Sequence, residues 1–183
     1  MQFPVRSRMK MTVVERFRSL LQEPFAAVKQ MGVVEGIRVA DLGAGEGYFT
    51  IPSAIVAGRS GFVYSIEPDQ GRSDKIRARV VKEGLVNVRV LTSKAENLSE
   101  IPSGDVDLAF SAFSIHHFED RDTALREIRR VLRDGGVFYL WDQVPGRVFR
   151  WGTRPQDLQQ MSSGFSRFEQ IDTQKAIRAR FVK

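Results

Sequence analysis

Short apolar runs alternate with helical patterns along most of this chain. Five runs read as buried strands, at 37–42, 62–66, 88–91, 106–110 and 137–141. Apolar residues at helical spacing lie between them, at 47–57, 70–83 and 121–133. Strands that alternate with helices predict a parallel sheet with helices on both faces, so the fold class is α/β.

The end of the chain breaks this alternation. A short helix is expected at 155–162, and two strand-like runs follow it, Phe165–Ile171 and Ala176–Val182. The turn between these runs is too short for the crossover that parallel strands need. We therefore expect an antiparallel hairpin at one edge of the sheet.

A glycine-rich turn follows the first strand, within VADLGAGEGYFT at residues 39–50. Glycines permit a tight turn and let a ligand lie against the backbone, whose amide groups then act as donors. Glu67 ends the second strand, 20 residues after Gly47. At that place a carboxylate can accept hydrogen bonds from both ribose hydroxyls of an adenosine.

The turn and the carboxylate fit three interpretations. The first is a dinucleotide site, but the glycine spacing is G-x-G-x-G, and Tyr48 stands where the dinucleotide fingerprint needs a small residue. The terminal hairpin is also foreign to dinucleotide domains. The second is a purely structural turn, and the third is an adenosine site of another kind.

Five segments together resemble the class I methyltransferases that use S-adenosylmethionine (SAM), especially the small-molecule group that includes the ubiquinone and menaquinone methyltransferases. The segments are VADLGAGEGYFT, SIEP at 65–68, DLAFS at 107–111, HHF at 116–118 and ALREIRRVLRDGGVFYLW at 124–141. The resemblance runs from about Val33 to Val182. It implies a Rossmann-like doubly wound sheet of seven strands in the order 3-2-1-4-5-7-6, with the last strand antiparallel.

The resemblance also implies a cofactor site. Glu67 would hold the ribose of SAM, and the methionine end would lie against Asp41, Gly43, Ala44 and Gly45. We expect the remaining contacts from Tyr48, Pro68, Lys94, Ala95, Glu96 and Ser111. The family usually has Gly-Asp-Ala-Glu where this chain has Ser93-Lys94-Ala95-Glu96. Lysine cannot accept a hydrogen bond, so adenine recognition must come from the Ala95 backbone, Ser93 or Glu96.

Two histidines follow the fourth strand, at the edge where open sheets bind ligands. His116 and His117 are the candidates for a catalytic base that orients or deprotonates the acceptor. Alternatively, one of them hydrogen-bonds the loop, and methyl transfer needs only an aligned nucleophile. Asp142 and Gln143 reach the same edge, and capping of the loop is their alternative role. No metal is expected, since the chain has two histidines and no cysteine.

The chain carries 28 basic and 22 acidic residues, a net charge of +6, and 21 of the basic residues are arginines. A basic protein can bind nucleic acid or an acidic substrate. No dense basic run is interleaved with aromatics, which favours solvated helix faces and ion pairs. The expected reaction is transfer of a methyl group to a small-molecule acceptor, with S-adenosylhomocysteine (SAH) as the other product. The alternatives are an RNA or protein methyltransferase, and a SAM-binding protein without catalysis.

We expect one domain over 1–183. Residues 1–31 would form a helical lid, broken at Pro24, and 32–183 would form the SAM-binding core. No apolar stretch reaches the 18 or so residues of a membrane span, and the N-terminus lacks the apolar core of a signal peptide. The expected location is therefore the cytoplasm. The oligomeric state of the protein is not predicted.

Overall fold

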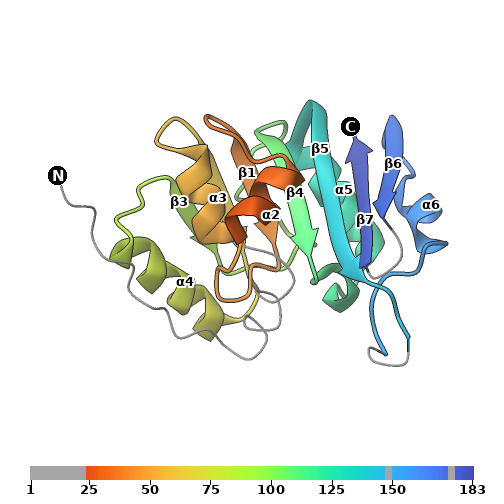
Figure 1. Cartoon of the computed structure of the whole chain (residues 1–183), viewed down its shortest axis with the longest axis horizontal. Helices are drawn as coiled ribbons and strands as arrows, with labels where there is room; N and C mark the ends of the chain where they lie inside the picture. The colour runs from red at the N-terminus through yellow and green to blue at the C-terminus, as the bar shows by residue number, and fades with distance from the viewer. Residues whose placement is uncertain (1–23, 147–149, 173–175) are drawn as a thin grey trace.

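The computed structural model describes residues 24–146, 150–172 and 176–183 (Figure 1). Seven strands form one sheet in the order β3-β2-β1-β4-β5-β7-β6. Their bounds are β1 Arg38–Leu42, β2 Phe62–Ile66, β3 Val88–Leu91, β4 Val106–Ala112, β5 Leu132–Gln143, β6 Arg167–Asp172 and β7 Ala176–Val182. This order confirms the predicted Rossmann-like, doubly wound α/β fold.

The strand directions confirm the predicted hairpin. β1 pairs in parallel with β2 and β4, β2 with β3, and β4 with β5. β7 is antiparallel to both β5 and β6. The carboxyl ends of the five parallel strands β1 to β5 therefore meet along one edge of the sheet, the lower edge in Figure 1.

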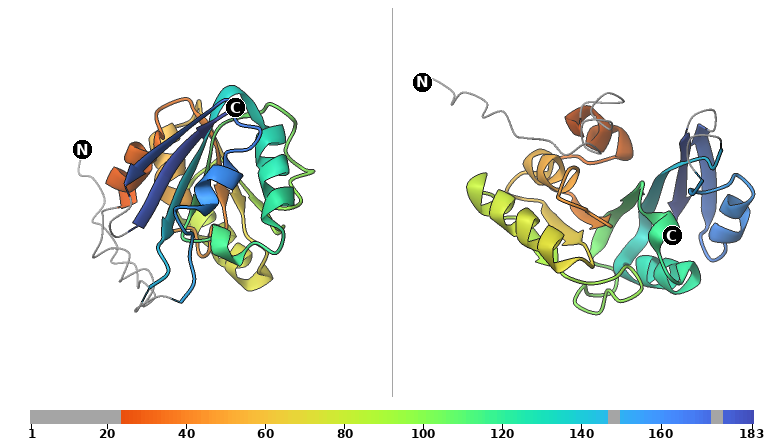
Figure 2. Two further views of the ribbon diagram at one scale, coloured as in Figure 1. Left: turned by 90° about the vertical axis from the view of Figure 1, so that its right-hand side faces the viewer. Right: turned by 90° about the horizontal axis from the view of Figure 1, so that it is seen from below.

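Helices cover both faces of the sheet, as Figure 2 shows. Their bounds are α2 Pro24–Met31, α3 Thr50–Ala57, α4 Gln70–Lys82, α5 Arg121–Val131 and α6 Asp157–Met161, with a short 3-10 helix, η1, at Ile115–His117. One apolar core joins α2 and α3 to the sheet. The other joins α5 and α6 to the opposite face. The sheet is thus the middle of three layers, which leaves its edges for polar chemistry.

The sequence of α5 explains its bounds. Asp120 caps its start by accepting from the Thr123 amide, and arginines fill its last turn, the charge order that the helix dipole favours. Its buried residues form one apolar stripe, Ala124, Leu125, Ile128 and Val131. The helix and the strand after it were predicted, but their boundary was wrong, with the helix expected to reach residue 133 and the strand to begin at residue 137. β5 already begins at Leu132, because Leu132 pairs with Val106 of β4.

The start of the described chain belongs to the sheet core. Ala27, Val28 and Met31 of α2 are buried against the face that α3 also covers. The rest of the segment predicted as a lid, residues 1–23, lies outside the described residues. None of the described helices is long and apolar enough to cross a membrane.

Candidate functional site

A cavity of about 620 Å³ lies at the carboxyl edge of the sheet, a volume typical of sites for small ligands. Ten predicted site residues line it: Gly43, Ala44, Gly45, Tyr48, Glu67, Pro68, Lys94, Ala95, Glu96 and His117. The sequence did not single out several other lining residues, among them Glu46, Arg72, Phe113, Ser114, Phe118 and Glu119. Three predicted site residues, Asp41, Ser111 and His116, are not part of the wall.

The amide groups of the glycine turn are bound to β2 and its end. The amides of Gly43 and Ala44 both donate to the carbonyl of Ile66 at 2.9 Å. The amide of Gly45 donates to Oε2 of Glu67 at 2.8 Å. We expected these amides to act as donors to the ligand, and that expectation was wrong. A pyrophosphate depends on such donors, whereas a cationic ligand does not.

Gly43 is required by a close approach. Its φ is +72°, and a Cβ atom there would lie 2.4 Å from Cβ of Ser114. Ser114 is held in place because its hydroxyl donates to the carbonyl of Leu42 at 2.6 Å. Ser111 lies behind it, with its Oγ 2.7 Å from Oγ of Ser114. The structure therefore places Ser111 as a support of the cavity wall, because its β4 side chain is fully buried.

Asp41 is likewise behind the turn. Its side chain is buried in the sheet, and its Oδ2 accepts from the hydroxyl of Thr50 at 2.6 Å. The Thr50 oxygen also lies 3.0 Å from Oγ of Ser65 on β2. Asp41 thus ties the start of α3 to the sheet, which explains why α3 begins at Thr50 instead of residue 47.

Glu67 presents a carboxylate with spare acceptor capacity. The residue is only 4% exposed, its Oε2 is engaged by Gly45, and its Oε1 accepts from the Asp69 amide at 3.2 Å. An ionised carboxylate offers about four lone-pair sites. Two protein donors therefore leave room for two ligand hydroxyls, which is what a ribose edge would require.

The cavity wall is rich in carboxylates. Four glutamates and two cationic side chains line it: Glu46, Glu67, Glu96, Glu119, Arg72 and Lys94. Nζ of Lys94 lies 2.7 Å from Oε2 of Glu119, and this hydrogen bond raises the pKa of Lys94 above its ordinary value. The surplus of negative charge suits a ligand with cationic groups.

Residues 93–96 replace the family's adenine-binding motif, and some of their polar groups are already hydrogen-bonded within the protein. The Ser93 hydroxyl donates to the carbonyl of Asn97 at 2.6 Å, so its proton is used within the loop. Oε1 of Glu96 accepts from the Asp120 amide at 3.1 Å, while its other oxygen keeps acceptor capacity. Glu96 and the Ala95 backbone are therefore better placed than Ser93 to recognise an adenine.

The two histidines differ sharply in their surroundings. His117 is exposed and lines the cavity. The side chain of His116 is 3% exposed, and its Nδ1 lies 2.9 Å from Oδ1 of the fully buried Asp142. Nε2 of His116 is buried and has no hydrogen-bond partner among the described residues. A neutral imidazole that donates from Nδ1 carries an acceptor lone pair on Nε2, so His116 has the arrangement of a base.

Comparison with known proteins gives the family. A family model described as a methyltransferase domain matches residues 40–140. The chain belongs to the class I SAM-dependent methyltransferases. The matched range runs from within β1 to within β5 and contains every lining residue of the cavity.

Curated relatives and solved structures agree with this family. A demethylmenaquinone methyltransferase of Geobacillus sp. (strain WCH70) is 28% identical over 127 residues, 69% of this chain and 54% of that protein. The ubiquinone/menaquinone biosynthesis C-methyltransferase UbiE of Burkholderia vietnamiensis is 32% identical over 109 residues, 60% of this chain and 44% of that protein. The chain therefore spans about half the length of the curated relatives it matches.

Two solved structures share the methyltransferase fold along most of their length. A SAM-dependent methyltransferase of Aquifex aeolicus has a TM-score of 0.75 and 25% identity, and the match covers 90% of this chain and 91% of that one. A structure from Methanococcus maripaludis, titled a putative SAM-dependent methyltransferase, has a TM-score of 0.73 at 17% identity. That match covers 98% of this chain and 97% of the other, and it shows the fold alone.

An aromatic group stands where β4 and β5 of the methyltransferase fold end. Phe113, which lines the cavity, has a φ of +57°, a value that non-glycine residues adopt rarely and often at functional sites. Its amide donates to the carbonyl of Trp141 at 2.7 Å, and the two rings lie 4.9 Å apart. The guanidinium of Arg178 lies over the Trp141 ring, 4.5 Å from its centre. No sequence pattern signals such a backbone conformation, so Phe113 was missed.

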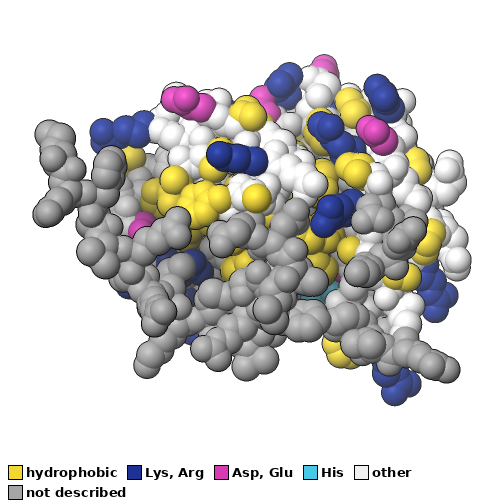
Figure 3. All heavy atoms as spheres, viewed as in Figure 1, with side chains coloured by type: hydrophobic (Ala, Val, Ile, Leu, Met, Phe, Trp, Pro, Cys, Tyr) yellow, Lys and Arg dark blue, Asp and Glu magenta, His cyan; other side chains and the backbone are white. Residues whose placement is uncertain are grey.

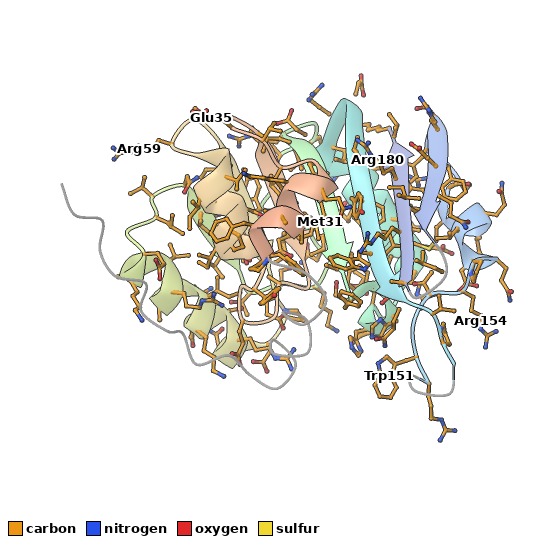
Figure 4. The ribbon with its side chains drawn as sticks, viewed as in Figure 1. Met31, Glu35, Arg59, Trp151, Arg154 and Arg180 are labelled. Atoms are coloured by element: carbon orange, nitrogen blue, oxygen red, sulfur yellow. The ribbon has the colours of Figure 1, made fainter. Side chains whose placement is uncertain are left out.

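The segment after β5 also reaches this edge. Figure 4 shows Trp151 and Arg154 on that segment, at the lower end of the sheet. Trp151 is 56% exposed, and Arg150 and Arg154 are exposed as well. Arg147 and Phe149, from the same segment, lie outside the described residues. Within the part of the chain that the structure places, no cluster of three or more histidine or carboxylate side chains could hold a metal ion.

Proposed function

We propose that this chain transfers the methyl group of SAM to a small-molecule acceptor and releases SAH. When bound, SAM supplies a methyl group on a positively charged sulfur. The observation that carries the proposal is the joint arrangement of Glu67 and the glycine turn. The carboxylate keeps two acceptor sites free for a ribose, while the amides that a pyrophosphate would need are already bound.

Different residues of the wall would bind different parts of SAM. The backbone of Gly43, Ala44 and Gly45 lies where the methionine part fits, and Glu67 holds the ribose. Tyr48 and Pro68 close the sides of the cavity, and Glu96 with the Ala95 backbone faces the adenine. Asp41 and Ser111 support this site from behind. The glutamates of the wall attract the cationic sulfur and ammonium groups of SAM.

His116 and His117 act on the acceptor in this proposal. His117 lies on the cavity wall. In His116, Nδ1 faces Asp142, which leaves the lone pair of Nε2 to accept a proton. A base placed there takes the acceptor's proton as its nucleophilic atom bonds to the methyl carbon. Alignment of the methyl acceptor beside the sulfonium raises the reaction rate separately from this base.

Three observations support a small molecule as the acceptor. Many arginines are engaged within the protein, as Arg38 is with Asp105 and Arg130 with Glu127. On the face shown in Figure 3, the lysine and arginine side chains occupy separate positions instead of one basic block. The curated relatives are named for demethylmenaquinone and for ubiquinone and menaquinone biosynthesis.

Calorimetry tests the cofactor. SAM and SAH are expected to bind with affinities on the order of micromolar, since enzyme sites tend to match metabolite levels. NADH is expected not to bind. Binding of NADH without binding of SAM or SAH would contradict the proposal.

Transfer of a labelled methyl group from SAM in a cell extract tests the acceptor. Label is expected in the small-molecule fraction and not in RNA or protein. The exposed Arg150 and Arg154 favour RNA as the second candidate, with an affinity that falls steeply as salt rises. Filter binding at low and high salt, with both arginines replaced by alanine, separates the two. Binding of SAM with no labelled product in any fraction would instead indicate a protein without catalysis.

A further inference from the structure

The segment that leaves β5 returns to touch its last residue. The amide of Thr153 donates to the carbonyl of Gln143 at 3.0 Å, and Nε2 of Gln143 donates to the carbonyl of Trp151 at 3.1 Å. Between them, Gly152 has a φ of +141°, and a Cβ atom there would lie 2.2 Å from the Gln143 oxygen. Only glycine permits this crossing, which brings Thr153 beside the end of β5.

Thr153 completes the hydrogen bonding of a buried carboxylate. Both Thr153 and Asp142 are fully buried. The Thr153 hydroxyl donates to Oδ2 of Asp142 at 2.7 Å, and the Gln143 amide donates to Oδ1 at 2.9 Å. Oδ1 also faces Nδ1 of His116 at 2.9 Å. Each oxygen therefore has a donor, as a charge in the interior requires.

We propose that Thr153 is a positioning residue that acts on His116 through Asp142. By holding Oδ2, it fixes the orientation in which Oδ1 faces the imidazole. A carboxylate oxygen only accepts, so Nδ1 of the neutral ring carries the hydrogen and Nε2 keeps a free lone pair. Thr153 thus selects the tautomer in which His116 serves as a base. This inference rests on the proposed function for its use in catalysis, but the tautomer itself is independent of it.

The state of Nε2 indicates the chemistry of the acceptor. This nitrogen is buried and has no hydrogen-bond partner among the residues that the structure describes, and a buried polar atom of this kind calls for a ligand or another explanation. With the hydrogen on Nδ1, Nε2 can only accept, so a methyl acceptor that meets it must carry an O–H or N–H group. The proton passes to Nε2 while the oxygen or nitrogen forms the bond to the methyl carbon. The carbon–sulfur bond breaks at the same time, and its electron pair stays on sulfur.

Nuclear magnetic resonance can read the tautomer directly, because the chain has only two histidines. Long-range proton–nitrogen spectra of the ligand-free chain distinguish Nδ1–H from Nε2–H for each ring. Wild-type His116 is expected to be mainly Nδ1–H. In Thr153→Val the ratio of Nδ1–H to Nε2–H is expected to fall at least about threefold, since a hydrogen bond to a charged group is lost. Thr153→Ser, which keeps the hydroxyl, is expected to restore the ratio.

Thr123→Val is the matched control, because the Thr123 hydroxyl also donates to a carboxylate, but to that of Asp120 and not to that of Asp142. It is expected to leave the His116 ratio unchanged. A wild-type His116 that is mainly Nε2–H would overturn the inference, and so would an unchanged ratio in folded Thr153→Val. Should valine prevent folding, Thr153→Ala takes its place with the same readout, and the wild-type spectrum remains a test by itself.

Calorimetry with SAM separates this inference from the proposed function. Thr153 and Asp142 do not line the SAM cavity, so Thr153→Val is expected to bind SAM within about twofold of the wild type. A tenfold loss in that variant would indicate general distortion and overturn a positioning role. Absence of SAM binding in the wild type would contradict the proposed function and leave the tautomer result standing.

Discussion

The two edges of the sheet use similar residues in opposite ways. At the amino edge, Nη2 of Arg38 and the hydroxyl of Tyr64 both reach Oδ2 of Asp105, at 2.5 and 2.8 Å. At the carboxyl edge, the Glu67 carboxylate keeps acceptor capacity, and Nε2 of His116 has no hydrogen-bond partner within 24–146, 150–172 and 176–183. The first edge is a closed network within the protein, and the second is a network that a ligand would complete.

The difference predicts which property each edge controls. Groups that are satisfied within the protein contribute to folding, whereas groups with unused hydrogen-bonding capacity are a cost to folding that ligand binding offsets. Substitutions at the amino edge are therefore expected to change stability without changing SAM affinity. Substitutions at the carboxyl edge are expected to do the reverse, except where the backbone itself is packed tightly.

Gly43→Ala is expected to have the largest effect because it affects both properties. A left-handed conformation costs about 1–2 kcal/mol in a non-glycine residue, and the clash with Ser114 adds about 1–3 kcal/mol. The free energy of unfolding in urea should fall by about 2–5 kcal/mol, and SAM affinity by more than about tenfold. Gly45→Ala is the control, since a Cβ atom there meets nothing within 4 Å. Equal losses in both variants would show that the contact with Ser114 is unimportant.

Glu67→Ala is expected to affect SAM binding alone. The loss should be roughly 1.5–3 kcal/mol, the range for hydrogen bonds to a charged group. The free energy of unfolding should change little, because the carboxylate lies at a strand end and not in the apolar core. Glu46→Ala serves as control, since this cavity glutamate is paired with Lys75 at 2.6 Å. Calorimetry that finds unchanged affinity in folded Glu67→Ala would show that Glu67 does not reach the ribose.

Asp105→Asn tests the amino edge. Burial raises the pKa of Asp105, but hydrogen bonds from Arg38 and Tyr64 and the charge of Arg38 outweigh it, so the pKa lies below its ordinary value. The stabilisation is therefore complete above the ordinary carboxyl pKa of about 3.9 and is lost as the pH falls through the lower folded value. At pH 7 the variant should unfold more easily by about 1–2 kcal/mol.

Urea unfolding at neutral and strongly acidic pH, with calorimetry for SAM at neutral pH, checks this expectation. The difference from the wild type should shrink in acid, and SAM affinity should stay within about twofold, since the two edges are independent. A large loss of SAM affinity in a variant of normal stability would break the comparison between the edges.

Patterns of the sequence predicted the fold well because they reflect burial. The alternation of strands and helices and the terminal hairpin depend on neighbouring residues, and both were confirmed. The predicted wall residues were found through the glycine turn, the 20-residue spacing to Glu67 and the resemblance to the methyltransferase family. The β5 start at Leu132 was missed because its pairing with Val106 depends on a strand 26 residues away.

The finer features of the site depend on contacts that no local pattern records. Whether the amides of the turn donate to a ligand or to β2 is decided by the carbonyl of Ile66, on another strand. Phe113, with its positive φ, is bound through its amide to Trp141 on β5. His116 meets Asp142 across 26 residues and, through it, Thr153. Resemblance to a family located Asp41 and Ser111 at the site but could not show that they support the cavity wall from behind instead of lining it.

Lys94→Asp is expected to have the smallest effect. The resemblance places an aspartate at this position, and the substitution supplies an acceptor for the adenine amino group while removing a cation from the wall. It also breaks the exposed pair with Glu119, which contributes little to stability because water and salt screen both charges. SAM affinity should be equal or up to about threefold tighter, with the electrostatic part of the gain reduced at high salt. Lys82→Asp, the same change at the exposed end of α4, is expected to leave SAM affinity unaltered. A tenfold loss in calorimetry for Lys94→Asp alone would show that the pair with Glu119 shapes the cavity, and that this chain binds adenine differently from the rest of its family.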